Sequence, residues 1–382
     1  MLLSIFSIRK TAGCLLTLFL TITFSVFTQA APTTSELDDL FAIKLLAFEQ
    51  KDKGGAGGNP NLAEDASIYQ GVALLKRRIS DSDLIQLQGL WDEVSAASYD
   101  DAKDKASIIS GATGYNPGRW GLTAGWTHEM ADFDFSINAG YGQEFAYRAH
   151  NVGFGLRRSL AEGSTQLSVD VQLFDDEVRV FRWDGSQEPD DLRKTRTVNF
   201  GIVQTLTPVS AVNLGWSHTA QSGFLATSFN SVLVGTNREF ESVPDKRRRD
   251  AISIRYKHAL QQNSIQLGFG YYWDNWGIDS STVELRYYYW SNERIMLEPH
   301  LRLYTQSPAD FFADTFASTQ NSMSSDSDLG DFQSYSTGLL IHFFGARLLG
   351  YNQARLDLGL NYNHRSDDLN FYWMTFGASI PL

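Results

Sequence analysis

The stretch YYWDNWGIDSSTVELRYYYW, Tyr271–Trp290, decides the fold because both of its halves alternate between apolar and polar side chains. In the second half, Val283 and Leu285 alternate with Glu284 and Arg286. Alternation with a period of two is typical of a β-strand whose two faces meet different surroundings. Aromatic rings and charges can therefore share one segment, and the central DNWGIDSS is predicted to be a loop between two strands.

The same alternation recurs along the chain and predicts about 16 strands, within a range of about 14–18. The segments expected to form them are 40–50, 67–79, 83–95, 119–130, 132–142, 145–159, 164–178, 193–207, 210–222, 249–261, 263–274, 280–290, 294–306, 331–344, 352–364 and 370–381. Tight turns alternate with long loops at 51–66, 96–118, 179–192, 223–248 and 307–330. This pattern predicts an all-β fold, an up-and-down antiparallel transmembrane β-barrel with short periplasmic turns and long extracellular loops.

A soluble secreted β-protein is the alternative fold. Strands of soluble sheets are usually about 5–6 residues long. The segments here are about twice that, which is the length needed to cross a bilayer at a tilt of about 45°. Aromatic residues near the ends of the apolar faces, such as Trp120, Trp216 and Tyr256, are also typical of the girdles of a membrane barrel. The barrel is therefore preferred.

The last segment, FYWMTFGASIPL, resembles the C-terminal signal by which outer-membrane barrels are recognised for insertion. Thr375, Gly377, Ile380 and Leu382 stand in the patterned places, although a terminal Phe is usual where this chain has Leu382. The expected partners are accordingly the lipid bilayer, lipopolysaccharide and the outer-membrane assembly machinery.

The N-terminus has the features of a secretory signal peptide. Arg9 and Lys10 precede a short apolar run, and small residues stand at Thr28 and Ala30, so cleavage is expected between Ala30 and Ala31. The prediction is a signal peptide over 1–30 and a single barrel domain over 31–382, in the outer membrane of a Gram-negative bacterium. Cys14, the one cysteine of the chain, lies inside that leader, which excludes a disulfide framework and thiol catalysis in the exported part.

Charge argues against a nucleic-acid partner. The chain has 32 basic and 44 acidic residues and a formal net charge of −12, whereas a nucleic-acid-binding face is basic. The one basic run, KRRR at Lys246–Arg249, is flanked by Asp245 and Asp250 and is expected to be a solvated loop.

Three further stretches carry a resemblance to a known family. VPDKRRRDAISIRY at 243–256, LRLYTQSPADFF at 301–312 and SIISGATGYNP at 107–117, together with the opening stretch, resemble an uncharacterised bacterial family of outer-membrane β-barrels, domain of unknown function 3570. The motif residues are Asp274, Trp276, Gly277 and Asp310, while Ser281 departs from the family pattern, in which a histidine is expected, and this argues against a metal or proton-relay role there. The resemblance implies periplasmic redox proteins of the flavin-transferase and thioredoxin-like kinds as partners.

Charged and polar side chains are expected on one inner wall of the barrel. The candidates are Glu284, Arg286, Glu298, His300, Arg302, Tyr304 and Gln306, from two neighbouring segments. The simpler interpretation is a ladder of salt bridges and hydrogen bonds that satisfies polar groups away from lipid. The sharper hypothesis is a charged constriction that selects an anionic or zwitterionic solute.

The sequence favours a non-enzymatic, porin-like protein that passes or binds a solute or serves as a scaffold for periplasmic partners. No nucleophile elbow or HExxH zinc motif is present, and no catalytic, cofactor-binding or metal-binding residue is expected. The alternative is a barrel hydrolase with a site at the outer rim, for which His300 and Asp310 are a candidate pair without an identifiable serine.

Overall fold

The computed structural model describes residues 39–52, 65–97, 118–183, 185–228 and 230–382. The predicted signal peptide with Ala30 and Ala31, and the 107–117 stretch, lie outside these residues. Eighteen strands and one short 3-10 helix form in the described part. They are β1 (Leu40–Lys51), β2 (Asp65–Arg78), β3 (Asp83–Ala97), β4 (Gly118–Glu129), β5 (Asp134–Glu144), β6 (Tyr147–Leu160), β7 (Thr165–Val178), β8 (Asp191–Thr207), β9 (Ser210–Gly223), β10 (Ser231–Val234), β11 (Asn237–Phe240), β12 (Lys246–Leu260), β13 (Asn263–Asp274), β14 (Asp279–Asn292), β15 (Ile295–Gln306), η1 (Ser327–Leu329), β16 (Phe332–Leu348), β17 (Tyr351–Arg365) and β18 (Asn370–Pro381).

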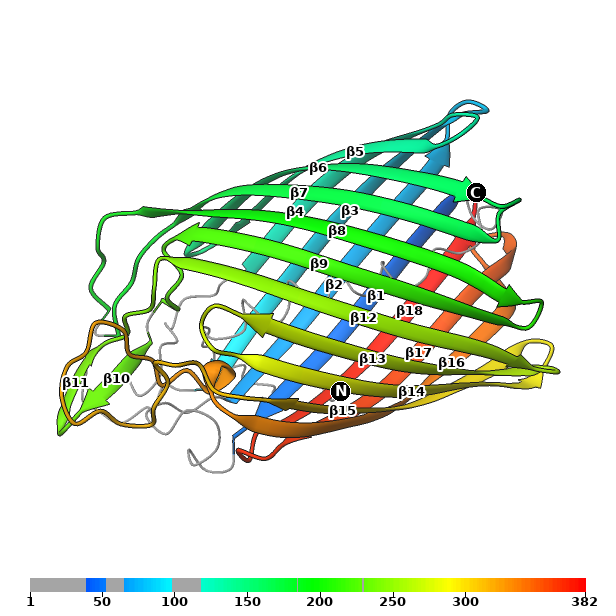
Figure 1. Cartoon of the computed structure of the whole chain (residues 1–382). Coiled ribbons are helices and arrows are strands. Elements are labelled where there is room, and N and C mark those ends of the chain that lie inside the picture. The colour runs from blue at the N-terminus through cyan, green and yellow to red at the C-terminus, as the bar shows by residue number, and fades with distance from the viewer. Residues whose placement is uncertain (1–38, 53–64, 98–117, 184, 229) are drawn as a thin grey trace, which may run out of the picture.

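Sixteen of these strands close into one antiparallel barrel, which confirms the predicted fold and strand number (Figure 1). Each strand pairs with its neighbours in the chain, and β1 closes the barrel by pairing with β18 from Leu40↔Pro381 to Lys51↔Asn370. The order is interrupted once, where β12 pairs with β9, because β10 and β11 form a separate two-stranded hairpin. The sequence did not predict this hairpin.

The connections alternate in length as predicted. Turns such as 261–262 and 349–350 lie at the end of the barrel that also holds Leu40 and Pro381. The opposite end, called the outer end below, carries the long connections, although the connections 145–146, 275–278 and 366–369 are also short there. An antiparallel pair can be joined by a two-residue hairpin, so the long connections are not needed to close the sheet and are free to form other structure.

The barrel is apolar outside and polar inside. Leu267, Phe269, Leu285 and Leu303, from neighbouring strands, are each 38–50% exposed, and the residues that alternate with them, such as Glu284 and Arg302, face the lumen. An outward apolar band around a polar interior is the arrangement of outer-membrane barrels. No helix in the described residues is long and apolar enough to cross a membrane.

Two outer loops fold together into a small structure, called here the outer cap, made of the described residues of 224–245 and of 307–331. The hairpin β10–β11 belongs to the first loop, and β-bridges join Val234 to Phe316 and Ser242 to Met323 across the two loops. Buried Val232, Phe316 and Met323 form its apolar centre. Figure 1 shows the cap standing beyond the strands at the outer end of the barrel.

Candidate functional site

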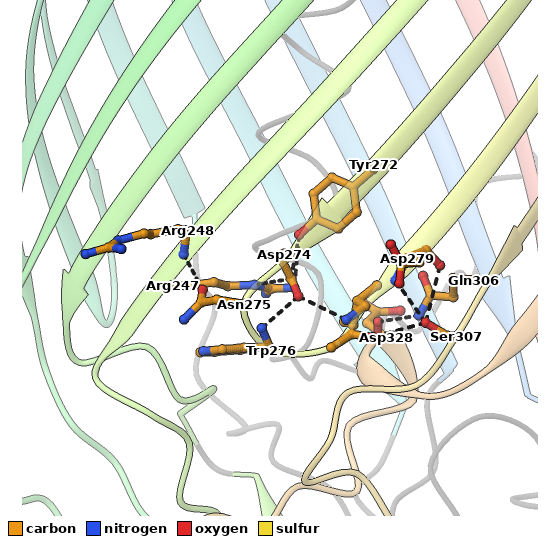
Figure 2. Close-up of polar contacts among 12 residues, drawn as sticks. Arg247, Arg248, Tyr272, Asp274, Asn275, Trp276, Asp279, Gln306, Ser307 and Asp328 are labelled. Atoms are coloured by element: carbon orange, nitrogen blue, oxygen red, sulfur yellow. Dashed lines mark hydrogen bonds and ion pairs between the residues drawn. The ribbon is translucent and has the colours of Figure 1, made fainter.

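Asp274 is the centre of a polar network at the outer rim, at the end of β13 (Figure 2). Its side chain is 0% exposed and accepts hydrogen bonds at 2.6–2.8 Å from Nε and Nη2 of Arg247 and from the Tyr272 hydroxyl. The other carboxylate oxygen accepts from the backbone N–H groups of Trp276 and Ile278 at 2.9 and 3.0 Å. A buried carboxylate with a paired guanidinium and several donors is fully satisfied, so Asp274 fixes the DNWGI loop.

Trp276 extends this network into the cap. Its indole Nε1 donates to the backbone oxygen of Lys246 at 3.0 Å, and the Arg247 guanidinium lies 4.2 Å from the centre of the ring. The other contact is an edge-to-face packing on Phe311, with ring centres 5.1 Å apart. The buried cluster of Trp276, Ile278, Ala309 and Phe311 thus attaches the 307–331 loop to the rim.

Gly277 and Asp310 are brought together at the same point. Gly277 has φ +89°, and a Cβ added there would overlap the Asp310 carboxylate. The Asp310 backbone N–H donates to the Trp276 oxygen at 2.8 Å. A positive φ and a close approach both require glycine, which explains the motif residue.

Tyr304 and Gln306 hold the other end of the 307–331 loop. The Tyr304 hydroxyl donates to Gln306 Oε1 at 2.7 Å, and Gln306 Nε2 donates to the backbone oxygens of Asp328 and Gly330. Asp328 also accepts from Arg365 Nη1 at 2.6 Å. These two residues, placed on the lumen wall by sequence, therefore support the outer cap.

The remaining predicted wall residues form a second group, called here the charge belt, nearer the other end of the barrel. Arg286 donates to Glu284 and to Glu298, each at 2.6 Å. His342 lies between Glu298 Oε2 at 3.1 Å and Asp357 Oδ1 at 2.6 Å. The belt continues through Arg355, whose Nε donates to Asp357 Oδ1 at 2.7 Å. These contacts match the salt-bridge ladder of the simpler interpretation.

His300 and Arg302 lie beside the belt. His300 pairs across the sheet with Arg286 and Gly338, and its buried Nδ1 has no hydrogen-bond partner. Arg302 lies 5.7 Å from the Tyr304 ring centre. His300 is six residues inside the end of β15, about 20 Å along an extended strand, whereas Asp310 lies against Gly277 at the rim, so the two do not form the pair that a rim hydrolase would need.

The C-terminal signal residues occupy both faces of β18. Thr375 and Gly377 face the lumen, where Thr375 lies against Gly359 and Asp357 lies against Gly377. Ile380 is buried and Leu382 is exposed.

Two features of the site escaped sequence reasoning. The sequence does not single out His342, although it shares the parity of the lumen-facing residues Ser336 and Gly338 of its strand. The prediction of a solvated loop at the KRRR run is wrong, because β12 begins at Lys246 and places Arg247 and Arg249 on the lumen face. The run itself carries no apolar–polar alternation, because Lys246 through Asp250 are all charged, and the alternation of β12 becomes readable only from Ile252 onward. Among the described residues no group of three or more His, Cys, Asp or Glu side chains is arranged to hold a metal ion.

Comparisons with known proteins found a matching family model and similar solved structures. The model of a protein family described as a protein of unknown function, DUF3570, matches residues 28–372. A search of curated proteins found no match. Similar solved structures include the siderophore receptor PirA from Acinetobacter baumannii (11% identity, TM-score 0.45, 85% of this chain and 52% of that one), the outer membrane protein OpdK from Pseudomonas aeruginosa (9%, 0.43, 89% and 98%) and a bacterial polysaccharide outer membrane secretin (7%, 0.49, 91% and 100%). This chain spans about half the length of the siderophore receptors that it matches, and these likenesses bear on the fold alone.

Proposed function

Because the chain belongs to the family of proteins of unknown function DUF3570, its role has to come from its own geometry, and we propose that it is a non-enzymatic outer-membrane barrel that admits a small polar solute along its lumen wall. The outer membrane of a Gram-negative bacterium is the proposed location. The apolar exterior and the closed sheet support a membrane-spanning barrel.

The observation that carries the proposal is that polar side chains of flanking strands pack against lumen-facing glycines. A Cβ added at Gly153 would overlap the amide groups of Gln172 and Asn138 from the flanking strands, and one at Gly155 would overlap Ser136. Those side chains therefore already occupy the space beside each glycine and lie along the sheet. A wall built in this way is polar and thin, which suits passage of a solute better than a core packed with large side chains.

The charge belt adds a second supporting feature. Its members satisfy one another: Glu298 and His342 are buried (6% and 3% exposed) and both are paired. A fixed, paired set of charges gives the lumen a polar lining that does not depend on a bound ion. Rings of charged side chains set the selectivity of many pores.

Single-channel conductance in planar bilayers tests the proposal. Wild-type protein is expected to conduct, and Gly153→Leu is expected to conduct less, because the new side chain pushes Gln172 and Asn138 into the lumen. Gly89→Leu is the matched control: Gly89 shares the lipid-facing parity of Leu87 and Trp91, and an added Cβ there meets nothing within 4 Å.

Two outcomes would contradict the proposal. A flat trace from correctly folded wild-type protein would favour a scaffold for periplasmic partners instead of a solute path. Lipase or protease turnover that is abolished by His300→Ala would show an enzyme.

A further inference from the structure

Arg249 is a lumen-facing cation that has no ion-pair partner among the described residues. It lies on β12 two residues from Arg247, on the same face, directly opposite Asp274 on β13 and Thr219 on β9. Its Nε is buried and has no hydrogen-bond partner. Within the described part of the chain no carboxylate forms an ion pair with it, since the rim carboxylate pairs with Arg247 instead.

The charged groups around Arg249 leave an excess of positive charge on this part of the lumen wall. Arg247 and Arg193 act on it as like charges, and the charge of Asp274 opposes them. Asp274 already accepts from both nitrogens of Arg247, from Tyr272 and from two backbone N–H groups. The Asp274 carboxylate therefore has no position left to accept a hydrogen bond from Arg249. Arg249 nevertheless stays cationic, because a guanidinium does not lose its proton in proteins.

A half-buried guanidinium without a partner is costly for the folded protein. Structures keep such a group where it binds a ligand, since a polar group left unpaired in the free protein gains its partner on binding. The wall beside Arg249 offers one further donor. Thr219 lies opposite Arg249 and its hydroxyl is 3.0 Å from that of Thr197, so one of the two hydroxyls donates to the other and one O–H stays available.

We propose that this part of the lumen wall binds the oxyanion group of a solute, a carboxylate or a phosphate, with Arg249 as the principal ligand. The planar fork of a guanidinium matches both oxyanions. Arg193, held by a hydrogen bond from Nε to the Phe224 backbone oxygen at 2.9 Å, adds positive charge that Asp176, opposite it on β7, offsets in part. The available threonine O–H completes the set. This inference deepens the proposed function and rests on it, since the oxyanion belongs to the solute that the lumen admits.

The test is calorimetric titration of the folded, detergent-solubilised barrel with sodium phosphate and, separately, with sodium acetate. Wild-type protein is expected to bind at least one of them, and the stronger of the two identifies the class. Arg249→Gln is expected to weaken that binding by about tenfold to a hundredfold, because a charge-assisted hydrogen-bonded pair is lost.

Arg248→Gln is the matched control. It removes the same charge one residue away, but the Arg248 side chain is exposed and points away from Asp274 in Figure 2, and Arg248 joins the rim network through its backbone N–H and C=O, which both bond to Asn275. Its affinity for the anion is expected to stay within about twofold of wild type. Arg249→Lys keeps the charge without the fork and is expected to fall between the two.

Stability gives a second readout, because the substitution that weakens anion binding is expected to stabilise the protein without anion. Without anion, Arg249→Gln is expected to raise the urea midpoint of unfolding, because it removes an unpaired buried charge. Phosphate or acetate is expected to raise the midpoint of wild type but not of Arg249→Gln, by the ordinary linkage of binding to folding.

Absence of binding of either anion to folded wild-type protein, or equal losses in Arg249→Gln and Arg248→Gln, would overturn the inference. So would a lower urea midpoint for Arg249→Gln, which would make Arg249 a structural residue. These failures are distinguishable from failure of the proposed function. A barrel that conducts but does not bind anions contradicts only the anion site, and a barrel that binds anions but never conducts contradicts only the passage of solute.

Discussion

Arg247 and Arg249 are the same residue type on the same face of the same strand, two positions apart, yet their surroundings differ completely. Arg247 lies over the Trp276 ring and is neutralised by Asp274, whereas Arg249 has neither contact. The paired arginine, Arg247, helps to hold the outer cap at the rim. The arginine without an ion-pair partner, Arg249, is available to bind a ligand. Substitutions that change the surroundings of one arginine at a time test whether this difference decides their roles.

The largest effect is expected for Asp274→Ala. The substitution leaves Arg247 buried without a counter-charge and two backbone N–H groups without acceptors, so the free energy of unfolding should fall by about 3–5 kcal/mol. Urea titration followed by tryptophan fluorescence measures this. Asp279→Ala, at an exposed carboxylate on the same hairpin that accepts only from Tyr271, should change it by less than about 0.5 kcal/mol. Equal losses of the free energy of unfolding in the two variants would show that pairing with Asp274 does not set Arg247 apart from Arg249.

The outer cap contains the acidic counterpart of Arg249. Glu241 is buried and accepts only from neutral donors, Thr227 N–H, Asn230 and Ser324. Asp326 is buried beside it, next to Asp328, which Arg365 neutralises. Burial, followed by repulsion from Asp326, raises the pKa of Glu241 to about 8, and burial raises the pKa of Asp326 to about 6. A carboxyl group can take up a proton where an arginine cannot lose one, so the cap needs no ligand.

Cap stability should therefore fall as pH rises. The folded cap binds more protons than the unfolded cap between about pH 4.5, the ordinary range of glutamate, and about pH 8, so stability is lost on going up through that window. The slope should be about 1.4 kcal/mol per pH unit for each group while it keeps its proton only in the folded state. From pH 5 to pH 7 this gives about 3 kcal/mol for Glu241 and about 1 kcal/mol more for Asp326, which loses its proton near pH 6. Hydrogen exchange of the amides in 230–245 measures it. A cap that becomes more stable over this range would show that Glu241 is ionised when folded.

The charge belt offers a case between these extremes, because each of the two partners of Glu298, Arg286 and His342, also contacts a second carboxylate. Glu298→Gln removes its charge-assisted bonds to Arg286 and His342, while Glu284 still holds Arg286 and Asp357 still holds His342. The free energy of unfolding should fall by about 2 kcal/mol, measured by urea titration. Glu177→Gln, which breaks an exposed pair with Arg148, should cost less than about 0.5 kcal/mol. A loss as large as that of Asp274→Ala would mean that the belt is less redundant than its contacts indicate.

The barrel could be predicted from sequence because each strand carries its own signal. The alternation of Val283 and Leu285 with Glu284 and Arg286 fixes which face meets lipid without reference to any other strand. The candidate site was harder, because its parts come from separate loops. Asp274, Trp276 and Gly277 were found by resemblance, but their use as anchors of the cap depends on Arg247 and Phe311, which lie 27 residues before Asp274 and 35 after Trp276. The hairpin β10–β11 also lacked a signal, because four-residue strands are too short to show a period.

Whether Arg247 depends on Asp274 alone can be tested with the smallest change, Trp276→Phe. The phenyl ring keeps a face for Arg247 and a partner for Phe311, but the indole N–H to the Lys246 oxygen is lost. The free energy of unfolding should fall by about 1 kcal/mol, the usual worth of one hydrogen bond. Trp273→Phe, on the lipid-facing side of the same strand end and stacked on Tyr271, should change it by less than about 0.5 kcal/mol. A loss from Trp276→Phe equal to that from Asp274→Ala would make the indole, rather than the carboxylate, the anchor that separates Arg247 from Arg249.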